Sequence, residues 1–170
     1  MAYDYDKLYG ETANALGNPT PVFVEFFNRL ERGQARVLDV GCGQGRDALF
    51  IARQGHDVTG VDISANGIRD LNEAAAKENL AVKGIVADIT AFTPDGLFDV
   101  ILIDRTLHML PEPPRLSVLQ RLLDHAGAGG WVLIADEASN ISGFEHVISN
   151  HRFGWTQEFA KRGHLFVRRT

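Results

Sequence analysis

The sequence predicts an α/β protein built on a doubly wound, mostly parallel sheet with helices on both faces. Short apolar runs alternate with helical patterns along most of its 170 residues, which indicates successive βαβ units. Most of these runs are nearly continuous, as expected of strands covered on both faces. The five runs are residues 37–40, 58–61, 84–87, 100–103 and 131–135.

Helical patterns fill the gaps between these runs. Thr20 followed by Pro21 is typical of a helix start, and Phe23 and Phe27 lie on one face of the helix that follows. Ser64 is the expected N-cap of a helix that runs to about residue 78. The other two helices are expected over residues 47–54 and from residue 113 to before residue 127.

The pattern changes after Asp136. Residues 153–159 alternate apolar and polar side chains, residues 161–163 resemble a turn, and residues 164–168 follow. This order predicts an antiparallel hairpin that closes one edge of the sheet and brings the strand total to seven. A chain of this length suits one domain, so we expect residues 1–170 to form a single unit.

Composition narrows the classes of partner. A formal net charge of −5 argues against a broad nucleic-acid or anionic-membrane surface. The basic residues near the C-terminus are expected to form a solvated strand face. The single cysteine, Cys42, excludes an intrachain disulfide, and neither a leader nor a membrane span is recognisable, so we expect a cytoplasmic protein. The six histidines are scattered, so no metal site is expected.

Each apolar run ends in or next to an aspartate. Because ligands bind beyond the carboxyl ends of parallel strands, these residues are expected along one functional rim. A rim this acidic suits a cationic ligand rich in hydroxyl and amino donors, whereas each aspartate alone could equally cap a helix. The five are Asp39, Asp62, Asp88, Asp104 and Asp136.

A glycine-rich turn follows the first run. Glycine occupies the alternate positions Gly41, Gly43 and Gly45, which permits positive φ and a close approach of a ligand to the main chain. The helix start beyond the turn favours an anionic group such as a carboxylate. The spacing G-x-G-x-G differs from the G-x-G-x-x-G of nicotinamide and flavin enzymes. Asp62, at the end of the second run, is placed to accept hydrogen bonds from ribose hydroxyls, a feature shared with those enzymes.

The ordered set of motifs resembles the class I S-adenosylmethionine-dependent methyltransferases, whose Rossmann-like sheet has seven strands. The stretch from Gly45 to Asp62 is similar to the tellurite-resistance methyltransferases and, less closely, to the thiopurine methyltransferases. The opening residues 5–10 and residues 107–110 fit the first group too. The motifs that carry the resemblance are VLDVGCGQGRD from residue 37, GVD from residue 60, VADI from residue 86 and FDVI from residue 98.

The resemblance implies a set of cofactor contacts. The turn, with Gly41, Gly43, Gly45 and Cys42, would line the methionyl part of S-adenosylmethionine. Its amino group would be held by Asp39 and by the main chain near Asp104. The ribose would be bound by Asp62, and the adenine by Ile63, Asp88 and Ile89.

The acceptor side is less constrained. Its candidates are Tyr9, Arg46, Arg105 and His108, and Tyr9 would lie on a lid formed by residues 1–18. Each has a plain structural alternative: His108 could cap or pack beside Met109, the arginines could neutralise neighbouring aspartates, and Tyr9 could serve packing alone. For Cys42, the simpler interpretation is that of a small side chain that fills space within the turn.

Three functions fit these features. The first is methyl transfer by in-line displacement to a small-molecule acceptor such as a thiol or a chalcogen oxyanion, with a general base where oxygen or nitrogen is methylated. The second is a catalytically silent protein that binds S-adenosylmethionine. The third, a nicotinamide-linked oxidoreductase, is disfavoured by the glycine spacing and by Asp88. The acceptor and the oligomeric state are left open.

Overall fold

The computed structural model describes residues 3–170, and these residues divide into two compact units that meet in sequence at Asp88 and Ile89. The strands belong to a seven-stranded mixed sheet. Their order is β3-β2-β1 in the first unit and β4-β5-β7-β6 in the second.

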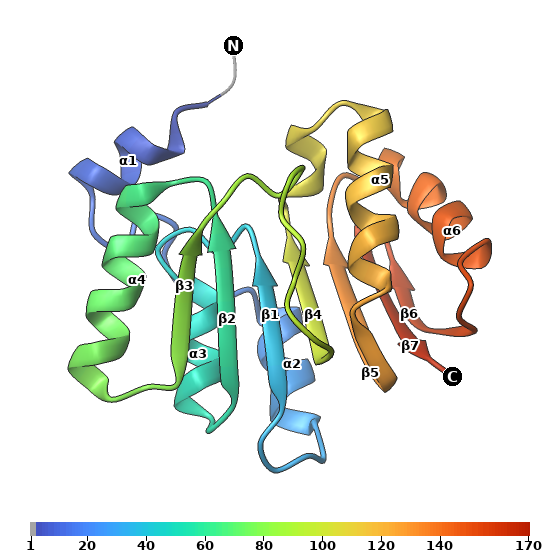
Figure 1. The fold of residues 1–170 in the computed structure, drawn as a ribbon, viewed down its shortest axis with the longest axis horizontal. Helices are drawn as coiled ribbons and strands as arrows, with labels where there is room; N and C mark the ends of the chain where they lie inside the picture. The colour runs from blue at the N-terminus through green and yellow to red at the C-terminus, as the bar shows by residue number, and fades with distance from the viewer. Residues whose placement is uncertain (1–2) are drawn as a thin grey trace. The chain divides into compact units, whose positions relative to one another are not determined.

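The first unit is built on three parallel strands (Figure 1). Parallel pairing aligns Asp39 with Gly60 and Asp62 with Val86, so both aspartates lie toward the carboxyl ends of their strands. Helices α3 and α4 follow the first and second strands. The bounds are β1 (Arg36–Val40), β2 (Asp57–Asp62), β3 (Val82–Val86), α3 (Arg46–Arg53) and α4 (Ala65–Glu78).

Two further helices precede the first strand. Helix α2 (Pro21–Arg29) begins with the expected proline and buries Phe23 and Phe27. Helix α1 (Tyr5–Glu11) is short, and the carboxylate of Asp4 caps it by accepting the N–H of Lys7. Its packing on α4 compensates for its length, because short helices derive most of their stability from tertiary contacts.

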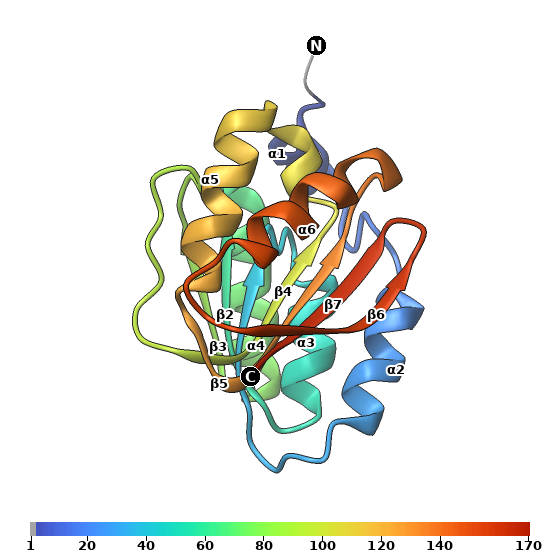
Figure 2. The ribbon, with the colours of Figure 1, turned by 90° about the vertical axis from the view of Figure 1, so that its right-hand side faces the viewer.

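The second unit combines parallel and antiparallel pairing (Figure 2). Strand β4 runs parallel to β5, which pairs antiparallel with β7, and β7 pairs antiparallel with the edge strand β6. Two single-turn 3₁₀ helices, η1 and η2, follow β4 and β5. The bounds are β4 (Phe98–Asp104), η1 (Leu107–Met109), α5 (Glu112–Leu123), β5 (Ala126–Ala135), η2 (Ala138–Asn140), α6 (Ile141–Ser149), β6 (Trp155–Lys161) and β7 (His164–Arg169).

The predicted fold class is confirmed: the sheet has seven strands, is mostly parallel and ends in an antiparallel hairpin, with helices around it. Sequence reasoning missed α6, whose Gly143 in the first turn and β-branched residues weaken the helical signal. That helix is stabilised by burial of Ile141, Phe144 and Ile148. No helix within residues 3–170 has the length and apolar character needed to cross a membrane.

Burial of His56 makes the first unit sensitive to acid. The imidazole is 4% exposed, its Nδ1 accepts the N–H of Ala35 at 3.1 Å, and it packs beside Phe27. Desolvation by burial lowers the pKa of His56 below its usual value of 6.5. The unfolded chain therefore binds the proton first, so the stabilisation is present above pH 6.5 and is lost as the pH falls through the folded-state pKa.

We predict that His56→Asn, whose amide oxygen can replace Nδ1 as the acceptor, flattens the acid limb of stability. Chemical denaturation at a series of pH values below 7 measures the effect. His146→Asn, on the exposed surface of α6, is the control and should retain the wild-type slope. An identical slope in wild type and His56→Asn would contradict the assignment.

Candidate functional site

The glycine turn joins the end of β1 to the start of α3. Gly41, Gly43 and Gly45 have φ of +75°, +53° and +87°, a region that glycine enters without steric cost. The amides of Gly41 and Cys42 donate to the carbonyl of Val61 at 2.7 and 3.1 Å. These bonds fasten the turn to the end of β2 and leave it at the carboxyl edge of the first unit.

Asp62 fixes the same turn from the end of β2. Its Oδ2 accepts the N–H of Gly43 at 2.9 Å, and its Oδ1 accepts the N–H of Ser64 at 2.8 Å. A carboxylate has about four lone-pair positions, so each oxygen can accept one more hydrogen bond. Asp62 therefore holds the turn and the start of α4 together and can still receive ligand hydroxyls.

The remaining cofactor candidates of the first unit differ in exposure. Asp39 is buried at 2% exposure, whereas Asp88, two residues beyond β3, is exposed. Ile63 follows Asp62 directly and is 71% exposed, more than any other large apolar side chain within residues 3–170. An acidic group buried beside the turn and an apolar side chain open to solvent together suit a ligand with both polar and apolar parts.

Tyr9 covers the turn from α1. A Cβ placed on Gly43 would lie 2.6 Å from the Tyr9 hydroxyl oxygen, so the phenol occupies the space that a side chain at position 43 would need. Burial, reinforced by the charge of Asp62, raises the pKa of Tyr9 above its usual value. Its hydroxyl therefore stays protonated at neutral pH and can donate a hydrogen bond.

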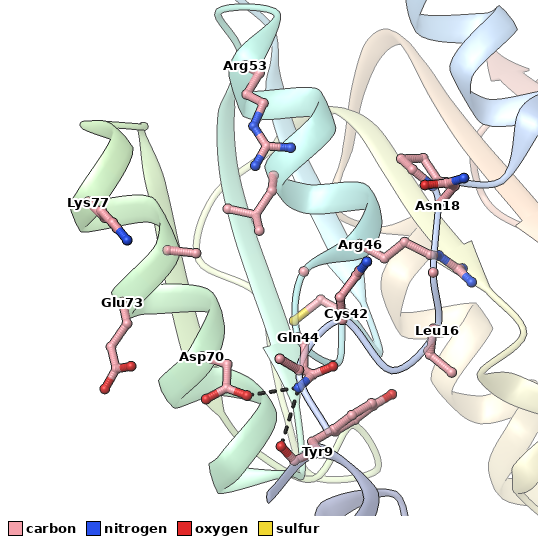
Figure 3. Close-up of a pocket in the computed structure, with 17 residues that line it drawn as sticks. Tyr9, Leu16, Asn18, Cys42, Gln44, Arg46, Arg53, Asp70, Glu73 and Lys77 are labelled. Atoms are coloured by element: carbon pink, nitrogen blue, oxygen red, sulfur yellow. Dashed lines mark hydrogen bonds between the residues drawn. The ribbon is translucent and has the colours of Figure 1, made fainter. Parts of the chain in front are cut away.

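Gln44 anchors the segment that follows Tyr9. Its amide nitrogen donates to the carboxylate of Asp70 at 2.8 Å and more weakly to the carbonyl of Tyr9 at 3.3 Å (Figure 3). The same nitrogen also donates to the carbonyl of Thr12 at 2.8 Å. Its amide oxygen accepts the N–H of Ala15 at 2.9 Å. Sequence reasoning treated position 44 as a spacer between glycines, and no sequence signal identified its partners.

A second anchor lies at the start of α1. The carboxylate of Asp6 accepts the Ser64 hydroxyl at 2.6 Å and the N–H and amide of Asn66 at 3.0 Å. The Ser64 hydrogen bond is the main cause that lowers the pKa of Asp6. Residues 3–18 of the expected lid thus contact the turn and α4, while Met1 and Ala2 of that lid lie outside the described residues.

A cavity of about 550 Å³ opens between the segment after α1 and helices α3 and α4 (Figure 3). Gln44, Gly45 and Arg46 line it, whereas Asp39 and Asp62 are absent from its described lining. Arg46 also contacts the carboxylate of Asp47 at 3.2 Å, in agreement with the neutralising role left open for it. This cavity therefore adjoins the turn through Gln44 and Gly45 without contact to Asp39 or Asp62.

Cys42 is a buried thiol within the turn. Burial raises its pKa well above the usual value, so the reactive thiolate is disfavoured. A Cβ on Gly60 would lie 2.8 Å from its Sγ, which shows how closely the side chain packs on β2. These observations favour the small-filler interpretation of Cys42.

The second unit contains the other predicted residues: Ile89 precedes β4, whereas Asp104, Arg105 and His108 lie at or beyond its end. Asp104 ends the strand, and Arg105 adopts a positive φ of 49° while its N–H donates to the carbonyl of Ala135 at 2.7 Å. The Ile89 carbonyl accepts the guanidinium of Arg121 at 2.6 Å. The backbone N–H of His108 donates to the buried Asp136 at 3.0 Å.

A comparison with protein-family models identifies a match to the methyltransferase domain over residues 37–130, more than half of the chain. The chain belongs to the class I S-adenosylmethionine-dependent methyltransferases. The matched range contains the turn, Asp62, Asp88 and His108. Proteins of this family use S-adenosylmethionine as the methyl donor.

Curated relatives agree with this membership. A Haemophilus influenzae protein named "Probable S-adenosyl-L-methionine-dependent methyltransferase TehB" is 36% identical over 58% of this chain and 35% of its own length. The 2-heptyl-1-hydroxyquinolin-4(1H)-one methyltransferase of Mycobacteroides abscessus is 34% identical over 74% of this chain and 56% of its own. The chain thus spans about a third to a half of the length of these relatives.

Solved structures share the fold. A TehB-like methyltransferase from Corynebacterium glutamicum superposes with a TM-score of 0.71 at 23% identity and covers 91% of this chain and 89% of its own. TehB from Haemophilus influenzae gives a TM-score of 0.68 at 22% identity, over 97% of this chain and 65% of its own. At these identities the likeness is one of fold.

We predict that Gly43→Ala destabilises the protein more than a positive φ alone explains. Alanine in the left-handed region costs about 1–2 kcal/mol, and contact with the Tyr9 ring adds about 1–3 kcal/mol of overpacking. Gly55→Ala is the matched control, because Gly55 also has a positive φ but a Cβ there meets no neighbour within 4 Å.

Free energies of unfolding from denaturant titration compare the two variants. In a Tyr9→Ala background, Gly43→Ala should cost less than it does in the wild type, because the ring that the new methyl group meets is absent. Equal losses in Gly43→Ala and Gly55→Ala would show that Tyr9 does not press on the turn.

Proposed function

We propose that this chain is an enzyme that transfers the methyl group of S-adenosylmethionine to a small-molecule acceptor by in-line displacement. The supporting observation is the glycine turn that Asp62 holds through the N–H of Gly43 while keeping lone pairs for a ligand. In such a displacement the leaving sulfide is already good, so alignment of the acceptor and exclusion of water supply much of the rate.

The proposed donor contacts follow the family pattern residue by residue. The methionyl part lies along Gly41, Cys42, Gly43 and Gly45, with its amino group at Asp39 and at the main chain near Asp104. The ribose hydroxyls donate to Asp62. Adenine packs on Ile63 and Ile89 and donates its amino group to Asp88. The exposure of Ile63 supports this assignment, because an adenine ring would cover a side chain that is otherwise left in water.

The proposed acceptor side uses Tyr9, Arg46, Arg105 and His108. The buried, protonated phenol of Tyr9 supplies a hydrogen-bond donor at the turn. Residues 1–18 act as a lid in a single domain of residues 1–170, and the anchors at Gln44 and Asp6 would hold that lid closed.

A small acceptor is favoured by the names of relatives. The Mycobacteroides abscessus protein is a quinolone methyltransferase, and a Zea mays relative, 37% identical over 78% of this chain and 26% of its own length, is phosphoethanolamine N-methyltransferase 1. The net charge of −5 supports an enzyme that acts on neither nucleic acid nor membrane. We further propose that this enzyme works in the cytoplasm. The silent cofactor-binding protein is the alternative.

Calorimetry with S-adenosylmethionine and with NAD tests the donor. We expect binding of the first and none of the second, and a preference for NAD would contradict the proposal. Turnover is tested with a panel of thiols, phenols, amines and oxyanions, including tellurite, by following S-adenosylhomocysteine. Binding without turnover across the panel would favour the silent alternative.

We predict that Asp62→Ala weakens S-adenosylmethionine binding by about 1–3 kcal/mol, because it removes charged acceptors from the ribose and loosens the turn. Asp57→Ala, at the opposite end of β2, is the control and should bind as wild type. Isothermal titration calorimetry measures both. Unchanged affinity in Asp62→Ala would remove this residue from the site.

We predict that Ile63→Ala weakens cofactor binding while leaving the free energy of unfolding nearly unchanged. The side chain is 71% exposed, so its apolar area is buried only by the ligand, and its truncation costs on the order of 1 kcal/mol of binding. Leu97→Ala, another apolar side chain at 53% exposure, is the control. A loss of stability equal to the loss of binding would argue for a packing role.

A further inference from the structure

Asp136 is a buried carboxylate to which the donor contacts assign no role. It follows β5 directly, and its side chain has no solvent exposure. Its Oδ1 accepts the N–H of Glu137 at 2.8 Å and the amide of Asn140 at 2.7 Å. Its Oδ2 accepts the backbone N–H of His108 at 3.0 Å. The residue therefore ties η1, after β4, to the loop after β5.

The imidazole of His108 lies against the same oxygen. Its Nδ1 is 3.9 Å from Oδ2 of Asp136, longer than a hydrogen bond but within the range of a charge contact. This Nδ1 is buried and has no hydrogen-bond partner within residues 3–170. The side chain as a whole is 21% exposed, so part of the ring reaches solvent.

The carboxylate beside Nδ1 bears on the tautomer of this ring. An ionised carboxylate attracts an N–H and repels a lone pair, so at 3.9 Å it favours the imidazole that carries its proton on Nδ1. The lone pair then resides on Nε2. A neutral imidazole with this tautomer can take a proton at Nε2 while the aspartate stabilises the resulting charge.

A second layer holds the carboxylate in place. The guanidinium of Arg115, from α5, donates to the amide oxygen of Asn140 and at 2.8 Å to the carbonyl of Leu110. Asn140 in turn donates to Asp136. The charged groups of this network are thus the Asp136 carboxylate, which faces the ring, and Arg115, which is linked to that carboxylate through Asn140 by two hydrogen bonds.

We infer that Asp136 is a positioning residue that fixes His108 as a base, and that the acceptor is therefore a hydroxyl or an amine. The inference rests on the proposed methyl transfer and specifies its substrate class. The acceptor O–H or N–H gives its proton to Nε2, and its electron pair forms the bond to the methyl carbon. The S–CH₃ bond breaks with its electrons left on sulfur, which yields S-adenosylhomocysteine, the methylated acceptor and an imidazolium.

This arrangement distinguishes among the acceptors. A thiolate or a chalcogen oxyanion is already an anionic nucleophile, so it gains little from a base. Phenolic or aliphatic hydroxyls and ammonium-derived amines must lose a proton, and an oriented imidazole contributes most to them.

The tautomer is measured directly by long-range ¹H–¹⁵N correlation on the full-length protein with labelled histidine. His108→Gln assigns the signals of His108. We expect the Nδ1–H tautomer in the wild type and a shift toward Nε2–H in Asp136→Asn. His125 is an internal reference for the Nδ1–H form, because its Nδ1 lies 2.8 Å from the carbonyl of Gly96, which only accepts. An Nε2–H tautomer in the wild type would overturn the inference.

Kinetics with the acceptors found in the panel provide the second arm. His108→Gln should slow methylation of a hydroxyl or amine by about 10²–10⁴-fold and that of a thiolate by less than about tenfold. Asp136→Asn should lower kcat for the hydroxyl or amine acceptor and leave the KM for S-adenosylmethionine unchanged. Equal losses on both acceptor types would show a merely structural role.

The two proposals fail separately. Absence of S-adenosylmethionine binding in calorimetry contradicts the proposed function and leaves the tautomer result standing. Normal binding with a wild-type Nε2–H tautomer, or with turnover confined to thiolates, contradicts the inference alone.

Discussion

The hydrogen bonds of Asp62 are the constraint on which the first unit's site depends. One carboxylate at the end of β2 accepts the amide of Gly43 in the turn and the amide of Ser64 at the start of α4. Charge-assisted bonds are about twice as strong as neutral ones, so the turn, the strand end and the helix start are held in one arrangement. The positive φ of the glycines is tolerable because this arrangement and the carbonyl of Val61 specify it.

The second unit has a comparable carboxylate, Asp136, directly after β5. Asp136 also follows a strand and also gathers backbone and side-chain donors, but it is fully enclosed and faces an imidazole. Asp62 has acceptor positions left for a ligand. The acceptor positions of Asp136 are used mainly by donors of η1 and of the loop after β5. Two strand-end aspartates thus differ in burial, and with it in how many acceptor positions remain for a ligand.

Sequence patterns predicted the strands, the main helices and the family because these depend on local periodicity and on ordered motifs. The helix after Ser64 begins and ends as expected, with the Ser64 hydroxyl accepting the N–H of Gly67. The contacts of Gln44 and Asp136 were not predictable, because their partners lie 26 and 28 residues away, at Asp70 and His108. Helix α6 was missed since tertiary burial, rather than propensity, stabilises it.

The anchoring by Gln44 also bears on where the family's core begins. The family match starts at residue 37, which suggests that the preceding residues are an appendage. Yet the amide of Gln44, inside the turn, bonds to residues 9, 12 and 15. A fragment trimmed to the matched range would leave this amide and the phenol-filled space above Gly43 open to water. The smallest autonomous piece that preserves the turn therefore extends beyond the region that sequence similarity delimits.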